Sequence, residues 1–255
     1  MSLVTVITGG SGGLGEELAY CAAKSGRKIV LVARSADKMK AIAERIVTLG
    51  APVPECVALD LTDPQSGAAL AKVLKQKNLK VFELINNAGY GLSGPVERID
   101  PADQLGIVDL NIRMLTDLTL RFLPEIIENK GGVMNVASTA AFQPGPNMAI
   151  YYASKAYVLS FSEAIWFELR GRARVTCLCP GPTPTGFAAR ASKRGNLVLM
   201  KFSRTSADFV AARGWDRFQR GQRVVVPGLL NEISAMFAPL MPKPLVLWLA
   251  AKISR

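Results

Sequence analysis

The sequence contains no histidine, and this absence excludes several kinds of site. A Ser-His-Asp hydrolase, a papain-like protease and a histidine-ligated metal centre each need an imidazole as base or ligand. Cysteine is also scarce: Cys21, Cys56, Cys177 and Cys179 show no paired metal spacing. We therefore expect no metal site and reduced, mostly buried thiols. Cys177 and Cys179 lie in a strand-like run, where we expect their thiols to point to opposite faces.

The chain also lacks the long apolar segments that a membrane span requires. No run of about 18 consecutive apolar residues occurs. No basic stretch followed by an apolar one precedes the first glycines. We therefore expect no transmembrane helix, no signal peptide and a cytoplasmic protein. Apolar residues make up 49% and charged residues 20% of the sequence, which indicates a single globular domain over residues 1–255.

Acidic residues are few compared with basic ones, 20 against 31, so the net charge is +11. The excess is concentrated between Arg190 and Arg223, where nine basic residues stand against Asp208 and Asp216. Such a region is either a solvated helix face and loop or a surface for an anionic ligand. No interleaved aromatic residues or nucleic-acid motif accompany it, so we expect no nucleic-acid partner.

Apolar, strand-like runs alternate with helical segments along the chain. The expected strands are Leu3–Thr8, Lys28–Ala33, Glu55–Leu61, Val81–Asn86, Val133–Ala137, Val175–Leu178 and Arg223–Val226. The expected helices lie near Gly15–Ser25, Ser35–Leu49, Pro64–Lys77, Pro101–Glu128, Tyr151–Arg170 and Ser206–Gly221. This alternation predicts an α/β fold with a doubly wound parallel sheet that helices cover on both faces.

A glycine-rich turn follows the first strand. Residues 8–15 read Thr-Gly-Gly-Ser-Gly-Gly-Leu-Gly, which contains both Gly10-x-Gly-x-x-Gly15 and Thr8-Gly-x-x-x-Gly-x-Gly15. Glycines allow positive φ and let the backbone approach a pyrophosphate closely, while the following helix offers free N–H groups to phosphate. The turn therefore predicts a dinucleotide site, although the sequence alone does not say which glycine has which task.

The ends of the next strands predict further parts of that site. No acid that would bind the ribose hydroxyls of NAD ends the second strand; Arg34 follows it, and a guanidinium suits the 2′-phosphate of NADP. Ser35 adds a hydroxyl beside it, whereas Asp37 falls where the next helix should begin. The third strand ends at Asp60, and the fourth ends in two amides followed by Ala-Gly.

A second group of polar residues follows the fifth strand. Ser138 closes an apolar run, a Pro-Gly-Pro loop comes next, and Tyr151 and Lys155 then lie four residues apart on one face of a helix. A hydroxyl, a phenol and an ammonium could therefore meet and form a proton-transfer centre, in which the cation lowers the pKa of the phenol. Tyr20 and Lys24 repeat the spacing without a strand-ending serine, which indicates an ordinary helical pair.

Together these motifs resemble those of the short-chain dehydrogenase/reductase family over about residues 3–228. The resemblance rests on Thr8-Gly-x-x-x-Gly-x-Gly15, Asp60, Asn86-Asn-Ala-Gly89, Asn111 in a long apolar helix, Ser138, Tyr151-x-x-x-Lys155 and Pro180-Gly-Pro-Thr183. It implies a Rossmann-type sheet of about seven strands and hydride transfer with a nicotinamide. It also implies a homodimer or homotetramer formed through the helices at 101–128 and 151–170.

The resemblance further implies a role for each site residue. Tyr151 is similar to the family's general acid/base, and Lys155 to the residue that binds the nicotinamide ribose. Ser138 would orient the substrate oxygen, and Asn111 would hold a water of the proton relay. The expected cofactor is NADP(H), and the residues expected to contact it are Thr8, Gly9, Ser11, Gly12, Gly13, Leu14, Gly15, Arg34, Ser35, Asp60, Leu61, Asn87, Ala88, Gly89, Tyr151, Lys155, Pro180, Gly181 and Thr183.

The C-terminal third of the chain follows no tight family pattern. Residues 184–222 are expected to hold a substrate loop and lid. Residues 228–255 form an apolar extension that Pro239, Pro242 and Pro244 prevent from being one straight helix. This extension either packs over the pocket or at a subunit contact, or lies on a membrane surface.

We interpret the chain as an NADPH-dependent carbonyl reductase, or alcohol dehydrogenase, for a small hydrophobic ketone or alcohol. One alternative is a 3-oxoacyl thioester reductase, in which the basic region contacts a phosphorylated carrier. A second alternative is a non-catalytic NADP(H)-binding redox sensor. A sensor would not need the complete set of Asn111, Ser138, Tyr151 and Lys155.

Overall fold

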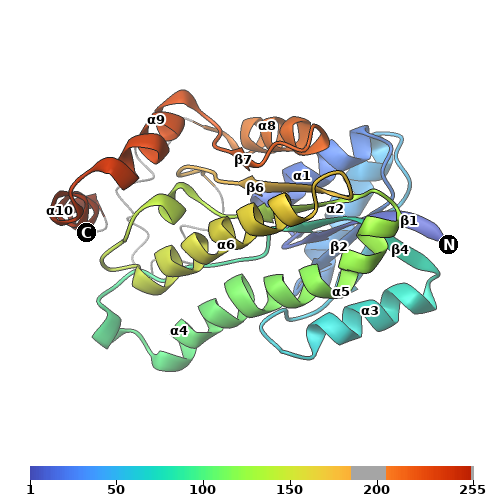
Figure 1. Cartoon of the computed structure of the whole chain (residues 1–255). Helices are drawn as coiled ribbons and strands as arrows, with labels where there is room; N and C mark the ends of the chain where they lie inside the picture. The colour runs from blue at the N-terminus through green and yellow to red at the C-terminus, as the bar shows by residue number, and fades with distance from the viewer. Residues whose placement is uncertain (185–204, 254–255) are drawn as a thin grey trace.

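The structure is a computed structural model that describes residues 1–184 and 205–253 (Figure 1). Its centre is a seven-stranded sheet in the order β3-β2-β1-β4-β5-β6-β7, and every neighbouring pair is parallel. The strands are β1 Ser2–Thr8, β2 Ile29–Ala33, β3 Glu55–Ala58, β4 Leu79–Asn86, β5 Gly132–Val136, β6 Arg174–Leu178 and β7 Val224–Val225. The predicted doubly wound parallel sheet is confirmed.

Helices cover both faces of this sheet. The helices are α1 Gly13–Lys24, α2 Ala36–Thr48, α3 Ser66–Gln76, α4 Pro101–Val108, α5 Leu115–Glu128, α6 Ala149–Glu168, α8 Ala207–Gln219, α9 Leu229–Phe237 and α10 Lys243–Ile253. On one face, side chains from α1, α2 and α8 pack against Ile7 and Leu31. On the other face, side chains from α3 and α5 pack against Val6 and Val30. Alternate strand residues point to opposite faces, so nearly continuous apolar runs supply both cores.

The strand alternation corrects one expectation about the cysteines. Residues two apart in a strand point to the same face, not to opposite faces. Cys177 and Cys179 are both buried, and their sulfur atoms lie 3.7 Å apart. Cys21 and Cys56 are partly exposed free thiols, so only two of the four cysteines, all of which lie within the described residues, are buried.

The predicted helix Pro101–Glu128 is interrupted. A π-helical segment, Asp109–Met114, separates α4 from α5. The wider turn of a π-helix changes which side chains face inward, and such segments are frequent at functional sites. Asn111 lies in this segment and is buried.

The region predicted as a substrate loop and lid, 184–222, is only partly described, because residues 185–204 lie outside the described residues. Its described part includes α8, which packs against α1 through Val210, Trp215 and Phe218. This helix covers the sheet and contributes no residue to the pocket described below. The lid at 184–222 stays a prediction.

Candidate active site

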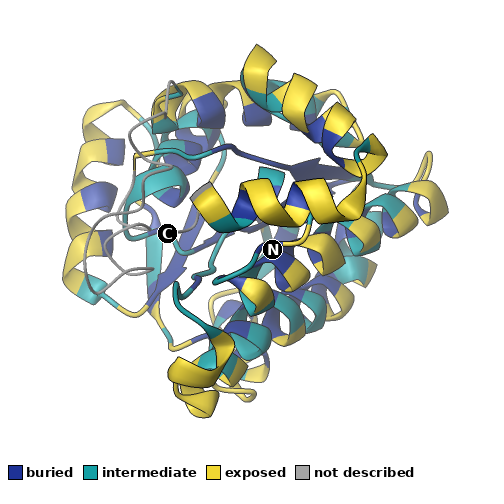
Figure 2. Ribbon diagram, turned by 90° about the vertical axis from the view of Figure 1, so that its left-hand side faces the viewer, coloured by how far each residue is buried: buried dark blue, intermediate teal, exposed yellow. Residues whose placement is uncertain are grey.

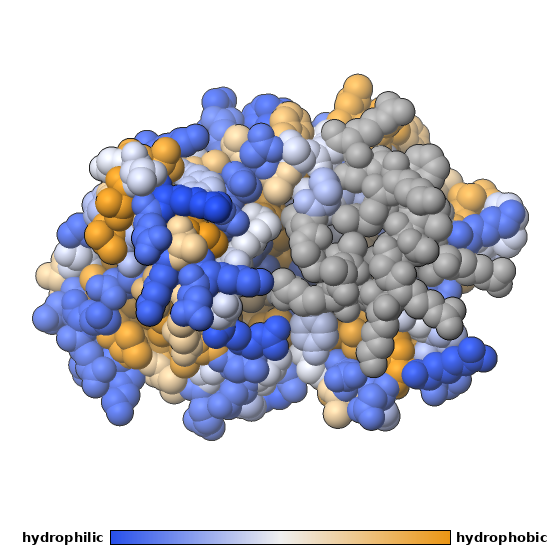
Figure 3. All heavy atoms as spheres, turned by 180° about the vertical axis from the view of Figure 1, so that it is seen from behind, coloured by the Kyte–Doolittle hydropathy of each residue, from blue (hydrophilic) through white to orange (hydrophobic). Residues whose placement is uncertain are grey.

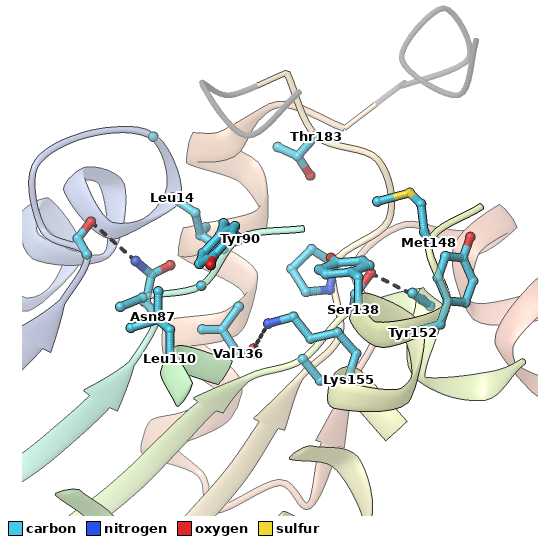
Figure 4. A pocket seen from close by; sticks show the side chains of 18 of the residues that line it. Leu14, Asn87, Tyr90, Leu110, Val136, Ser138, Met148, Tyr152, Lys155 and Thr183 are labelled. Carbon is cyan, nitrogen blue, oxygen red and sulfur yellow. Dashed lines mark hydrogen bonds between the residues drawn. The ribbon is translucent and has the colours of Figure 1, made fainter. Parts of the chain in front are cut away.

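A pocket of about 1520 Å³ opens at the carboxyl ends of the strands, where parallel α/β sheets bind their ligands (Figure 4). Most residues predicted to form the site line it. They are Gly9, Ser11, Gly12, Gly13, Leu14, Gly15, Arg34, Ser35, Asp60, Leu61, Asn87, Ala88, Gly89, Ser138, Tyr151, Lys155, Pro180, Gly181 and Thr183. Thr8 and Asn111, by contrast, lie behind its wall.

The glycine turn is held by hydrogen bonds to the end of β4. The hydroxyl oxygen of Thr8 accepts from the backbone N–H groups of Asn87 and Ala88, each at 3.0 Å. The Asn87 amide donates to the Thr8 carbonyl at 2.9 Å and to the Gly9 carbonyl at 3.4 Å. A Cβ at Gly15 would overlap the Gly9 carbonyl oxygen, and Gly9 itself has φ of 68°. The turn therefore depends on Gly9 for its conformation and on Gly15 for close packing.

The ends of β2 and β3 form a basic edge of the pocket. Arg34 is exposed and lines it, and Lys38, in the first turn of α2, lines it as well. Lys38 was not predicted, although its place at the start of the helix that follows Arg34 could have indicated it. Asp60 accepts from the backbone and hydroxyl of Thr62 at 3.0 and 2.8 Å. These bonds, with the charge of Arg34, lower the pKa of the Asp60 carboxyl.

Asn111 does not face the pocket, but it braces the residues that do. Its side-chain oxygen accepts from the Tyr90 backbone N–H at 3.2 Å, and its amide donates to the Tyr90 carbonyl and to the Ser154 hydroxyl, both at 3.0 Å. Ser154 in turn donates to the Tyr151 carbonyl at 2.7 Å. Ser154 was missed by sequence reasoning, because a serine within a helix carries no signal of its partner. The amide of Asn111 thus links the end of β4 to the first turn of α6.

Ser138, Tyr151 and Lys155 reach the same part of the pocket from β5 and α6. Ser138 is the N-cap of a short 3-10 helix, Thr139–Phe142, and its hydroxyl oxygen accepts from the Ala140 N–H at 3.1 Å. The Lys155 ammonium donates to the Val136 carbonyl at 2.8 Å and lies 5.8 Å from the centre of the Tyr151 ring. Figure 4 shows Ser138 and Lys155 on adjacent sides of the cavity. The predicted convergence of hydroxyl, phenol and ammonium is therefore present in the structure.

Burial determines the protonation of this cluster. It raises the pKa of the Tyr151 phenol to about 12, and a hydrogen bond with Ser138 offsets part of that rise. It lowers the pKa of the Lys155 ammonium to about 8. Lys155 was expected to lower the pKa of the phenol, but burial raises this pKa and the opposing contribution comes from Ser138. The phenol is consequently held protonated near neutral pH.

The C-terminal extension forms the apolar wall of the pocket. Its lining residues are Asn231, Ser234, Ala235, Ala238, Met241, Val246, Leu249 and Ala250. A Cβ at Gly181 would overlap the Asn231 amide, so α9 packs directly on the turn that follows β6. The prolines separate α9 from α10 as predicted, with a 3-10 turn, Ala238–Leu240, between them. Of the alternatives left open for this extension, packing over the pocket describes its inner side.

Tyr90, Met148 and Tyr152 also line the pocket and were not predicted; Figure 4 shows Tyr90 beside Leu14, and Met148 with Tyr152 on the side of Ser138. No motif marks Tyr90 or Met148, and Tyr152 follows Tyr151 on α6 without a signal of its own. The second tyrosine-lysine pair lies elsewhere: Tyr20 donates to Glu16 at 2.7 Å on α1 and does not line the pocket. It is the ordinary helical pair that the sequence indicated.

Two further observations concern only the part of the chain that the structure describes. Within residues 1–184 and 205–253, no group of three or more metal-ligating side chains comes together. Among the helices of those same residues, none has both the length and the hydrophobicity to cross a bilayer.

Comparison with curated proteins gives relatives of moderate similarity. The chain is 33% identical over 184 residues to 11-beta-hydroxysteroid dehydrogenase-like 4A of Arabidopsis thaliana. The match covers 72% of this chain but only 62% of that relative. The chain therefore spans less than two thirds of the length of this relative.

Comparison with solved structures gives matches over nearly the whole chain. A short-chain dehydrogenase from Sphingobium yanoikuyae in complex with NADPH has a TM-score of 0.81 and 29% identity, and the match covers 92% of each chain. A 3-ketoacyl-(acyl-carrier-protein) reductase from Brucella melitensis complexed with NADH has a TM-score of 0.72 and 30% identity, covering 88% of this chain and 94% of that one. A family model described as short chain dehydrogenase matches residues 3–196. The chain therefore belongs to the short-chain dehydrogenase/reductase family.

Proposed function

We propose that the protein is an NADP(H)-dependent oxidoreductase that interconverts a hydrophobic ketone or aldehyde and its alcohol. The observation that carries this proposal is the meeting of Ser138, Tyr151 and Lys155 between a polar and an apolar half of one pocket. The polar half has a glycine turn and a basic edge, which suit a dinucleotide. The apolar half is closed by α9 and α10, which suits a hydrophobic substrate.

Each part of the polar half has a proposed contact. The turn at Gly9–Gly15 and the start of α1 would hold the pyrophosphate, and Arg34 with Lys38 would bind the 2′-phosphate. Asp60 would contact the adenine. Asn87 and Thr183 would contact the nicotinamide half, near Tyr151 and Lys155. When bound, the nicotinamide supplies or accepts the hydride.

The side chains at the reacting centre would donate and accept the proton of the reaction. A carbonyl that receives hydride develops negative charge on its oxygen, which requires donors placed at that atom. The Tyr151 phenol, held protonated by burial, would donate its proton there, while the Ser138 hydroxyl would give a second hydrogen bond. Lys155, fixed by the Val136 carbonyl, would hold the cofactor ribose. Asn111 would position this machinery through Tyr90 and Ser154, without contact to the substrate.

A 3-oxoacyl thioester is the second candidate substrate, because the similar Brucella melitensis protein reduces a 3-ketoacyl group on a carrier protein. Arg190, Lys193 and Arg194, the basic residues proposed to contact such a carrier, lie outside the described residues. The described basic residues of α8 include Arg217 and Arg220, which pair with Asp216. A hydrophobic ketone remains the preferred substrate class, because the described walls supply apolar contacts.

A panel of aliphatic, aromatic and steroid ketones and 3-oxoacyl thioesters, each with NADPH and NADH, tests the proposal through cofactor consumption. The wild type should prefer NADPH by about ten- to a hundredfold in kcat/KM, because one or two charge-assisted hydrogen bonds hold the 2′-phosphate. The double variant Ala33→Asp, Arg34→Ala should reverse this preference. Equal use of both cofactors by the wild type would contradict the NADP assignment, and absence of turnover with every substrate would favour the redox-sensor alternative.

A further inference from the structure

The outer side of the C-terminal extension exposes several large apolar side chains. Leu229, Leu230, Met236, Phe237, Leu240 and Trp248 are each half or more exposed. They belong to α9, α10 and the turn between them, at the end of the molecule opposite the N-terminus (Figure 1). Figure 2 views this end and shows exposed residues along the outer helix, and Figure 3 shows hydrophobic side chains among hydrophilic ones at the same end. Contiguous apolar surface of this kind marks a docking site for a protein or a membrane.

The inner side of the same helices is occupied. Ala235, Ala238, Val246 and Ala250 are buried and line the pocket. The outer side chains therefore cannot turn inward, because the wall of the pocket already fills that direction. The extension is therefore apolar on two sides. Without a partner, its outer apolar side would be covered by water.

The charges that border this face have one predominant sign. Between residues 228 and 255 the sequence has a single acid, Glu232, against Lys243, Lys252 and Arg255. Lys243 and Lys252 are exposed at the two ends of α10, and the Lys252 ammonium lies over the Trp248 ring at 3.8 Å. A tryptophan next to lysines on an otherwise apolar helix suits the boundary between acyl chains and headgroups.

We propose that this face docks the protein onto the surface of a membrane rich in anionic phospholipid. The apolar side chains of α9 and α10 would enter the headgroup boundary, while Lys243 and Lys252 would pair with lipid phosphates and carboxylates. A second copy of the chain would instead bring these lysines against each other, which like-charge repulsion opposes. α10 has only 11 residues, so it would lie on the bilayer and not cross it. The docking surface does not depend on the proposed reaction.

Sedimentation with vesicles tests the proposal, using phosphatidylcholine alone and phosphatidylcholine mixed with phosphatidylserine. Wild-type protein should bind the mixed vesicles preferentially and lose that preference at high salt. The double variant Leu230→Asp, Leu240→Asp should lower the partition coefficient at least about tenfold, because two apolar anchors are lost. The variant Lys243→Gln, Lys252→Gln should lower it about fivefold for each lysine and weaken its salt dependence.

A matched control is the double variant Leu49→Asp, Val53→Asp. It adds the same charge at apolar residues that are also exposed, between α2 and β3, and should bind like the wild type. If the leucine variant fails to fold cooperatively, the lysine variant and the salt series test the proposal in its place. Equal binding of the leucine variant and its control, or no preference of the wild type for phosphatidylserine, would overturn the proposal. The proposal would also be overturned if the wild type does not bind vesicles and light scattering shows that the leucine variant forms a smaller oligomer than the wild type.

Discussion

At the scale of single residues, Tyr151 and Tyr20 show how little a four-residue spacing means without its surroundings. Both have a lysine four positions later. Tyr151 lines the pocket and is paired with Ser138, whereas Tyr20 bonds to Glu16 on α1. The chemistry of the phenol is therefore decided by where its helix lies.

The exchange of each tyrosine for phenylalanine provides a direct test. Tyr151→Phe should reduce kcat about a thousandfold while cofactor affinity is retained, because only the proton donor is removed. Tyr20→Phe, the matched control, should leave kcat within a factor of about two. Rates would be measured by NADPH oxidation, and affinity by fluorescence titration. A nearly normal rate in Tyr151→Phe would rule out the assigned donor.

Lys155 is the second residue whose environment makes a measurable prediction. Its pKa is lowered to about 8 by burial, against 10.5 for the ordinary side chain. Below pH 8 the folded state carries a buried charge, and this costs about 3 kcal/mol. Between pH 8 and 10.5 the unfolded state binds the extra proton, so the free energy of unfolding should rise with pH in that window.

The variant Lys155→Met isolates this contribution. It should be more stable than the wild type at pH 7, and the difference between the two should shrink as the pH approaches 10. Urea denaturation at a series of pH values measures both quantities. A difference that stays constant from pH 7 to 10 would show that Lys155 is not buried in its charged form.

At the scale of elements, a buried carboxylate connects several strands at the end of the sheet opposite the pocket. Glu83 on β4 is fully buried and pairs with Arg27 at 3.1 Å and Arg174 at 3.0 Å. It also accepts hydrogen bonds from Thr5 on β1 and from Gln219 on α8. One side chain therefore connects β1, β4, β6 and α8.

Loss of this carboxylate should destabilise the whole sheet. Glu83→Ala leaves two partly buried guanidinium groups without their acid, and we expect a loss of about 3–5 kcal/mol in the free energy of unfolding. Asp216→Ala removes an exposed partner of Arg220 and should cost less than about 1 kcal/mol. Chemical denaturation distinguishes the two. Similar small losses in both would mean that the buried cluster contributes specificity but little stability.

At the scale of the whole molecule, α5 and α6 lie side by side (Figure 1), and each exposes an apolar residue. Leu120 on α5 is 58% exposed and Phe167 on α6 is 65% exposed. These are the helices through which the family resemblance implies a dimer or tetramer. We propose that this face is the subunit contact, separate from the C-terminal face.

The double variant Leu120→Glu, Phe167→Glu should dissociate the oligomer, because burial of four new carboxylates in each dimer is costly. Light scattering would record the change in mass. The variant Leu49→Asp, Val53→Asp serves again as the control, since it adds two acids away from this face. A wild type that is already monomeric at assay concentrations would remove the basis of the prediction.

The sequence alone determined the features that depend on local chemistry. The alternation of apolar runs with helical segments predicted the parallel sheet and most helices. The glycines after β1, the basic residue after β2 and the strand-ending Ser138 predicted the edge of the sheet that carries the pocket. Gly15 is an example of such a feature. Its position has no room for a Cβ, and the sequence shows this directly because only glycine lacks one.

The tertiary structure decided what depends on residues far apart in the chain. The partners of Asn111 come from the β4 end and α6, so the sequence could not show that its amide braces the site from behind. The same holds for the apolar wall, which α9 and α10 form because they fold back over the turn after β6. The raised pKa of Tyr151 results from that enclosure, since desolvation is a property of everything packed around a group and not of its neighbours in sequence.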